Sequence, residues 1–215
     1  IYTLSISNLQ TGGIDLSGNP TITIKTDKTS PSITGLNSSI YTTQDKWYSS
    51  ASNTFSWTPI ETDSGIQNYT YIVDTNATIA SNTLLTTGTK IIINSITLNN
   101  IANGISYFHI LARDNVDNVS DVATYTLRRD ATAPDIVNIS GPYNGIWQNI
   151  NSGPIISWTD PSSPSDDTFY ITNDGTDPSS TNFTYTTTAP TYDLPSQSDG
   201  ETVIKVRALN GAGTY

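Results

Sequence analysis

The chain repeats its own sequence pattern at an interval of about one hundred residues. Trp47 recurs as Trp147, and Ser56-Trp57-Thr58 recurs as Ser157-Trp158-Thr159. Two further matching segments are Asp27-Lys28-Thr29-Ser30-Pro31 and Asp130-Ala131-Thr132-Ala133-Pro134. This interval corresponds to a whole domain, because solenoid units repeat every 20 to 50 residues or so. The sequence therefore predicts a string of similar modules.

Charge and composition exclude several classes of partner. The chain carries a formal net charge of −10 at pH 7 and contains no cysteine. An acidic protein repels phosphate backbones, so we expect no nucleic-acid partner. No apolar stretch approaches the roughly 20 residues of a membrane-spanning helix, so we expect no membrane insertion in this segment. Cations are the small partners that this charge favours.

Short alternating runs between Pro31 and Asp130 predict strands, and helical periodicity is absent there. The expected strands are 33–36, 53–57, 66–74, 90–98, 105–113 and 124–128. Strands with turn signals at this spacing predict a two-sheet sandwich. In the strand around Phe108, a period of two places His109 on the face opposite the core, where we expect it to meet solvent.

Three segments of the middle module resemble a known family. Phe55-Ser56-Trp57-Thr58-Pro59 is similar to the tryptophan-bearing B strand of fibronectin type III and related bacterial immunoglobulin-like repeats, and residues 63–71 resemble their C strand. Residues 107–118 resemble their F strand and F–G turn, with Asp117 where glycine is usual. The resemblance implies an all-β fold of tandem immunoglobulin-like, fibronectin type III-like β-sandwiches.

The module boundaries follow from the repeat and this resemblance. Residues 1–29 are expected to be the last two strands of a preceding module, 30–130 a complete module, and 131–215 a module that lacks its final strand. The third module also carries residues 169–178, which resemble a hairpin of chitobiase C-terminal-like domains. That resemblance implies an accessory sandwich without catalytic residues. We expect Asp174-Gly175 to form a tight turn that needs a positive φ.

The two ends of the chain look incomplete in complementary ways. Two strands at 2–6 and 21–25 look like the end of a module, and Tyr215 falls where the third module should begin its final strand. One interpretation is a segment of a longer array. The other is a polymer in which the leading strands complete the open sandwich of the next subunit.

Catalytic chemistry has little support in the sequence, and we expect no enzyme. His109 is the one histidine, and the chain has no cysteine, so neither a catalytic triad nor a zinc site can be assembled. Asp166 and Asp167 are adjacent carboxylates, but we expect them in a solvated loop. A glycosidase would need two opposed acids in a cleft.

Calcium is the chemical hypothesis that the acidic residues favour. Hard cations take several oxygen ligands, and the module junctions gather carboxylates. Asp27 and Asp130 begin the two linkers, Asp15 lies in the turn of the first part, and Asp114 and Asp117 lie in the F–G turn of the middle module. Ordinary turn chemistry is the alternative, because Asp and Asn side chains bond to nearby backbone groups in turns.

Trp47 and Trp147 have two interpretations. Each lies just before a B strand and either covers the sandwich edge or stacks on a sugar ring. Recurrence at the same module position favours packing.

The sequence predicts a structural function. We expect a stalk, fibre, sheath or surface-layer segment of a prokaryotic cell-surface protein, located outside the cell. Its partners would be copies of itself or neighbouring modules, and a cell-surface glycan is a further candidate. The alternative is an adhesin segment or a carbohydrate-binding accessory part of a secreted polysaccharide-degrading enzyme.

Overall fold

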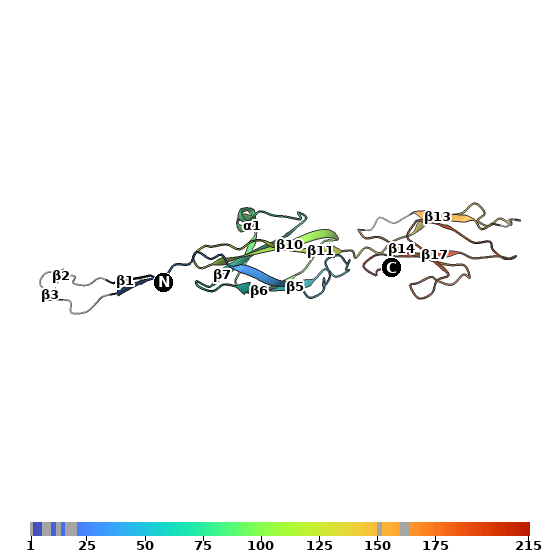
Figure 1. Cartoon of the computed structure of the whole chain (residues 1–215). Helices are drawn as coiled ribbons and strands as arrows, with labels where there is room; N and C mark the ends of the chain where they lie inside the picture. The colour runs from blue at the N-terminus through green and yellow to red at the C-terminus, as the bar shows by residue number, and fades with distance from the viewer. Residues whose placement is uncertain (1, 6–9, 12–13, 16–20, 150–151, 160–163) are drawn as a thin grey trace.

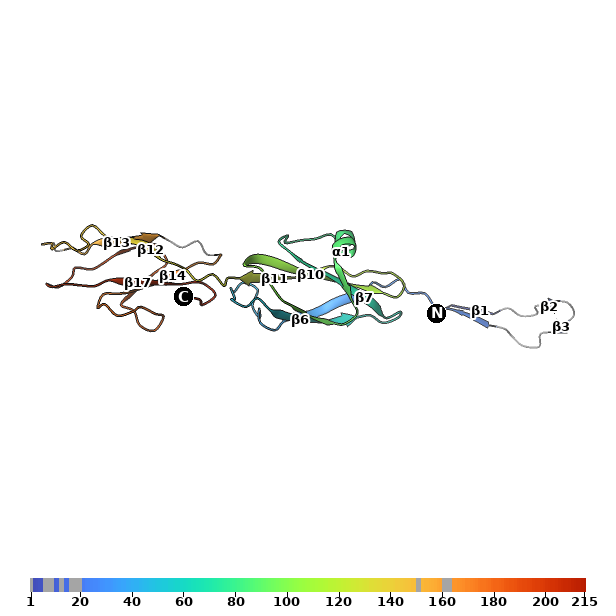
Figure 2. The same cartoon turned by 180° about the vertical axis from the view of Figure 1, so that it is seen from behind.

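The computed structural model describes residues 2–5, 10–11, 14–15, 21–149, 152–159 and 164–215. Three parts follow one another along the chain, a narrow N-terminal ribbon and two β-sandwiches (Figures 1 and 2). None of the helices in the described part of the chain is long and apolar enough to cross a membrane.

The middle module is a sandwich of two antiparallel sheets. One sheet has the order β5-β6-β9, and the other has the order β11-β10-β7-β8. The bounds of the first sheet are Ser32–Ser38 for β5, Asn53–Ile60 for β6 and Ser95–Leu98 for β9. Those of the second are Ile66–Asp74 for β7, Thr89–Ile91 for β8, Gly104–Asp114 for β10 and Ala123–Arg129 for β11. This arrangement confirms the expected all-β sandwich.

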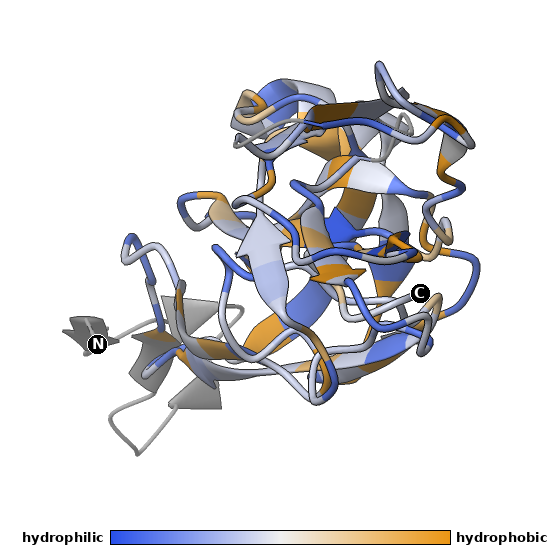
Figure 3. Cartoon of the chain, turned by 90° about the vertical axis from the view of Figure 1, so that its right-hand side faces the viewer, coloured by the Kyte–Doolittle hydropathy of each residue, from blue (hydrophilic) through white to orange (hydrophobic). Residues whose placement is uncertain are grey.

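Alternation along the strands builds the core of this module. In β6 every second side chain from Asn53 to Trp57 is buried, so Phe55 and Trp57 point between the sheets. Phe55 stacks on Phe108 of β10 with ring centroids 4.1 Å apart, and Trp57 meets the edge of Tyr69 at 5.2 Å. Hydrophobic and hydrophilic bands alternate along the strands when the chain is viewed end-on (Figure 3).

Two expectations for the middle module were wrong. The strand expected at 90–98 is divided into β8 and β9, which belong to different sheets, because the chain bends at Ile92 and Ile93 to cross the sandwich. His109 does lie opposite the core, but it is fully buried and does not meet solvent. The segment between β7 and β8 folds over that face and includes a short helix, α1 (Ser81–Thr87), which the sequence did not predict.

The third module repeats the architecture with shorter strands. One sheet has the order β12-β13-β16, with bounds Val137–Ser140, Ile155–Thr159 and Thr191–Asp193. The other has the order β15-β14-β17, with bounds Tyr185–Thr187, Thr168–Thr172 and Lys205–Leu209. Trp158 and Phe169 meet edge to face at 5.1 Å in its core, as Trp57 and Tyr69 do in the middle module.

The described residues of the N-terminal part form two-stranded ribbons. β1 (Tyr2–Ser5) pairs with β4 (Thr21–Ile24), and β2 (Gln10–Thr11) pairs with β3 (Ile14–Asp15). β4 leads directly into the linker at Asp27, just as β11 leads into the linker at Asp130. Most of the turn expected at 15–19 lies outside the described residues.

Candidate functional site: the joints between modules

The first linker is hydrogen-bonded to the loops of the middle module. Asp27 begins it, and its Oδ1 accepts a hydrogen bond from the backbone N–H of Thr29 at 2.9 Å. Its Oδ2 accepts one from the N–H of Ser64 at 3.2 Å, in the loop between β6 and β7. Asn118, in the F–G turn after β10, donates its side-chain N–H to the Asp27 carbonyl at 3.4 Å. Asp27 therefore joins the linker to two loops, to one through its carboxylate and to the other through its backbone carbonyl.

The second linker is held by a similar set of contacts. Asp130 accepts a hydrogen bond from the N–H of Thr132 at 3.0 Å, and from the N–H and the hydroxyl of Ser165 at 3.2 and 2.5 Å. Asn210 donates its side-chain N–H to the Thr132 carbonyl at 2.8 Å. Asp130 is fully buried, whereas Asp27 is half-buried. We call these two contact sets the first joint and the second joint.

The F–G turns beside the joints also share their geometry. Asp114 accepts hydrogen bonds from the N–H groups of Val116 and Asn118 at 2.9 and 2.8 Å. Asn210 accepts them from residues 212 and 214 at 3.2 and 2.7 Å. In both turns the residue five positions after a buried alanine has a positive φ. It is Asp117 (73°), after Ala112, in the middle module, and Gly213 (81°), after Ala208, in the third.

Aspartate at that position is consistent with the backbone it adopts, because Asp and Asn tolerate the left-handed region better than most residues. The side chain of Asp117 is largely exposed and forms an ion pair with Arg113 at 3.3 Å. The departure from the usual glycine therefore leaves the turn intact.

The first joint gathers three carboxylates. One oxygen from each of Asp27, Glu61 and Asp114 lies within 4.8 Å of the others. Hydrogen bonds from Ser64 and Thr29 hold the pKa of Asp27 below its ordinary value, so the group is ionised at neutral pH. Glu61 Oε2 is buried, and it has no hydrogen-bond partner among the residues that the structure describes. Like charges held this close repel one another, which a cation at this position would relieve.

The structure brings only part of the predicted calcium set together. Asp27 and Asp114 meet, and Glu61 joins them. Asp117 points to Arg113, Asp130 belongs to the second joint, and nothing is described of the side chain of Asp15. No sequence motif marked Glu61, because its proximity to Asp27 follows from the path of the linker past the end of β6.

Asp167 is buried, although we expected it in a solvated loop. It is only 8% exposed, whereas its neighbour Asp166 is exposed. The loop that contains it folds back beneath the second joint, where Ser165 bonds to Asp130. This position explains the burial of a carboxylate that the sequence assigned to solvent.

Trp47 lies at the second joint. A Cβ placed on Gly211, in the F–G turn of the third module, would lie 3.3 Å from Trp47 Cδ1 and 3.0 Å from Ser165 Cβ. The guanidinium of Arg128 lies 6.0 Å from the centroid of the Trp47 ring. Trp47 therefore packs between two modules. Its repeat counterpart Trp147 is 81% exposed.

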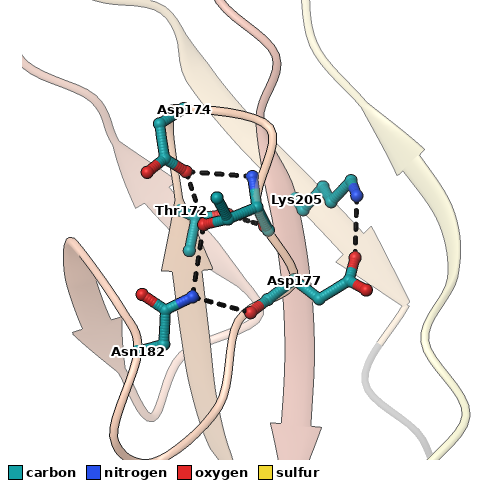
Figure 4. Close-up of polar contacts among 6 residues, drawn as sticks. Thr172, Asp174, Asp177, Asn182 and Lys205 are labelled. Atoms are coloured by element: carbon teal, nitrogen blue, oxygen red, sulfur yellow. Dashed lines mark hydrogen bonds and ion pairs between the residues drawn. The ribbon is translucent and has the colours of Figure 1, made fainter.

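The chitobiase-like hairpin has its polar groups engaged with one another (Figure 4). Asp174 Oδ1 accepts hydrogen bonds from the N–H and hydroxyl of Thr176 at 3.0 and 2.6 Å. Asn182 donates to the Asp177 carbonyl at 3.0 Å, and Lys205 pairs with the Asp177 carboxylate at 2.7 Å. Gly175 has a φ of 78°, which confirms the expected tight turn.

Known proteins resemble this chain only distantly. No family model and no curated protein matches it. Among solved structures it is similar to the central fibronectin type III array of RIM-binding protein, at 14% identity and a TM-score of 0.30, over 86% of this chain and 60% of that one. It is similar to a two-domain fibronectin type III segment of chicken tenascin, at 14% identity and a TM-score of 0.31, over 85% of this chain and 79% of that one.

A third similar structure is the chitinase ChiA74 of Bacillus thuringiensis, at 19% identity and a TM-score of 0.36. The match covers 90% of this chain and 29% of the chitinase, so the chain spans less than a third of that protein. The sheets and their order make the chain a tandem array of fibronectin type III-like β-sandwiches.

Proposed function

We propose that this chain is a structural segment of an extracellular array on a prokaryotic cell surface, and that its modules keep a fixed orientation. The observation that supports this function is the repetition of one hydrogen-bonded joint at both linkers. At each joint an aspartate bonds to a loop of the following module, and an F–G turn asparagine bonds back to the linker.

A rigid array needs linkers with little conformational freedom. Modules joined by a free linker move relative to one another by default. Here Pro31 and Pro134 restrict the backbone, and the Asp130 carboxylate is held in a fully buried position. A hydrogen bond to a charged group contributes about 1.5 to 3 kcal/mol, so several at one joint restrain its bending. A stalk or fibre needs this stiffness and no active site.

The test is a distance distribution across the second joint. Because the chain has no cysteine, spin labels can be attached to Ile92→Cys in the middle module and Phe183→Cys in the third. Pulsed electron spin resonance should give one narrow distribution. Asp130→Ala should broaden it, and Asp121→Ala, which removes an exposed carboxylate of the middle module, should leave it unchanged. A broad distribution in the unaltered chain would refute a rigid array.

A second candidate function is carbohydrate binding as an accessory part of a secreted enzyme or adhesin. The exposed ring of Trp147 favours it, since aromatic rings stack on sugars. A glycan array probed with the chain and with Trp147→Ala discriminates the two functions. Binding that is lost in the variant would favour the accessory role, and no binding by either protein would favour the spacer.

Calcium stays a prediction, and we propose the first joint as its binding site. There the three carboxylates of Asp27, Glu61 and Asp114 would supply hard oxygen ligands. The second joint has Asn210 where the first has Asp114, and its turn is hydrogen-bonded in the same way. The negative charge of Asp114 is therefore not needed to build the turn.

A further inference from the structure

Strand pairing aligns one sheet of the third module with one sheet of the middle module. Ala208 of β17 pairs with Phe169 of β14, as Ala112 of β10 pairs with Tyr69 of β7. β17 therefore corresponds to β10, and β14 corresponds to β7. Side chains on a strand point alternately into the sandwich and away from it, so the same positions of both modules form the outer face of this sheet. Neighbouring strands lie in the plane of the sheet and do not cover that face.

The outer face is buried in the middle module. Thr70, His109 and Leu111 point away from the sandwich there, and each of them is fully buried. Leu84 of α1 is also fully buried, and α1 lies against β7 and β10. The segment between β7 and β8 therefore converts this face of the middle module into a second layer of packed side chains.

The same face of the third module is open and carries different side chains. By the register of the strands, Tyr170, Lys205 and Arg207 occupy the three positions just described. Arg207 is exposed, the side chain of Lys205 is 42% exposed, and Tyr170 is half-buried. The described segment between β14 and β15 forms no helix. It is the hairpin of Figure 4, and it contributes Phe183, which is 45% exposed.

Aromatic rings and a guanidinium form a row across this face. The rings of Phe183 and Tyr170 have centroids 5.3 Å apart. Tyr170 pairs with Arg207 on the neighbouring strand, and side chains directly opposite in an antiparallel pair are neighbours. The Arg207 guanidinium lies 4.1 Å from the centroid of the Tyr215 ring. The Tyr215 hydroxyl accepts a hydrogen bond from the N–H of Ser180 at 2.6 Å, which holds that ring in place.

Arg207 is positioned, but its hydrogen-bond donors are not used. Its contact with the Tyr215 ring orients the plane of the guanidinium. Among the residues that the structure describes, Arg207 forms neither a hydrogen bond nor an ion pair. The planar guanidinium matches the geometry of a carboxylate and bonds to it through two parallel N–H donors. An exposed arginine held in this way is preorganised for an incoming carboxylate.

The few positive charges of the third module lie on this face. Residues 131–215 contain one lysine and one arginine, which are Lys205 and Arg207. Lys205 pairs with the Asp177 carboxylate at 2.7 Å, so the charge of this acid is compensated. Charges farther away than about 8 Å are largely screened at physiological ionic strength. A single anionic group is therefore attracted to Arg207, although the chain as a whole repels long polyanions.

We propose that this outer face binds a uronic acid residue of an acidic polysaccharide. The apolar side of the sugar ring stacks on Phe183 and Tyr170, because exposed aromatic rings offer apolar area to a sugar. The sugar carboxylate accepts two hydrogen bonds from Arg207. This site uses neither Trp147 nor the joints, so it adds a ligand to the structural role proposed above.

Calorimetric titration of the full chain with matched oligosaccharides tests this proposal. The probes are oligomers of galacturonic, mannuronic and glucuronic acid, and the control for each is the uncharged oligomer of galactose, mannose or glucose. The buffer contains physiological salt and a chelator, so that calcium does not bridge the acidic chain to an acidic sugar. At least one uronic acid oligomer should bind about tenfold more tightly than its uncharged control. Failure of all three to bind, or equal binding of the acidic and uncharged oligomers, would overturn the proposal.

Variants locate the binding. Arg207→Gln should weaken it about tenfold, and Arg207→Lys, which keeps the charge but loses the planar donors, should weaken it less. Phe183→Ala should weaken it several-fold. The matched control Lys90→Gln removes an exposed cation of the middle module and should leave binding unchanged.

Two outcomes with the variants would also overturn the proposal. One is binding that survives Arg207→Gln. The other is binding that Trp147→Ala abolishes and Arg207→Gln does not, because the sugar would then lie on the exposed Trp147 ring. The rigidity of the joints is measured without any sugar, so the proposed structural function stands or fails separately from this site.

Discussion

Replacement of Asp130 by alanine should destabilise the third module and uncouple it from the middle one. The carboxylate is fully buried and accepts hydrogen bonds from Thr132 and from two donors of Ser165. Its removal leaves the N–H and hydroxyl of Ser165, itself 7% exposed, without these acceptors. A buried unsatisfied group costs about 1 to 3 kcal/mol, and partial hydration offsets some of this, so we expect a loss of about 2 to 4 kcal/mol.

Urea unfolding followed by tryptophan fluorescence measures this loss. Asp130→Asn keeps one acceptor oxygen and should lose about 1 kcal/mol less than the alanine variant. Asp135→Ala removes an exposed carboxylate from the same linker and should change stability by less than about 0.5 kcal/mol. If Asp130→Ala behaved like Asp135→Ala, the joint would contribute nothing and the reasoning from its hydrogen bonds would be refuted.

Three further predictions concern other parts of the molecule. Calcium should raise the melting temperature of the chain, and a chelator should reverse the rise. Asp114→Asn, which imitates Asn210, should keep the turn and remove the response to calcium. An equal response in this variant would place any ion elsewhere. His109→Leu should lower the free energy of unfolding in urea by about 1 to 3 kcal/mol, because His109 forms hydrogen bonds with the Asn76 carbonyl and the Thr124 hydroxyl at 2.8 Å each. Amide exchange should accelerate mainly in residues 75–88. Unchanged exchange there would contradict the role of His109 in holding that segment. The hydrogen bond from Lys205 holds the pKa of Asp177 below its ordinary value of 3.8. The pair therefore stabilises the fold above pH 3.8, and this stabilisation is lost as the pH falls through the lower pKa of the folded state. An NMR titration should find the Asp177 pKa nearer 3.8 in Lys205→Gln, and an unchanged pKa would argue against the pair.

The sequence predicted the scaffold well because its signals are local. Alternation along the strand around Phe108 placed Phe108, Ile110 and Ala112 on the core face, where the structure has them. The repeat identified the linkers, and the resemblance identified the F–G turn with Asp117 at the glycine position. Alternation and turn patterns depend on residues a few positions apart, and the repeat is found by comparing the sequence with itself.

The errors arose where distant segments meet. His109 was correctly predicted to lie on the face of the sheet opposite the core, but the alternation of side chains does not tell which segment covers that face. The covering helix at 81–87 has the sequence SNTLLTT, with two adjacent leucines and no helical periodicity, so its formation depends on packing of Leu84 over the sheet. Glu61 was missed for the same reason, because only the fold brings it to Asp27.

The central claim is that the joints fix the orientation of successive modules, and residual dipolar couplings test it most directly. Couplings measured separately for residues 30–130 and 131–215 in one weakly aligned sample report how each module is oriented and how far it is averaged. If the second joint is rigid, both modules will give a single alignment tensor of the same magnitude and direction. Two tensors of different magnitude would mean that the modules reorient independently, and the account of this chain as a stiff array would be wrong.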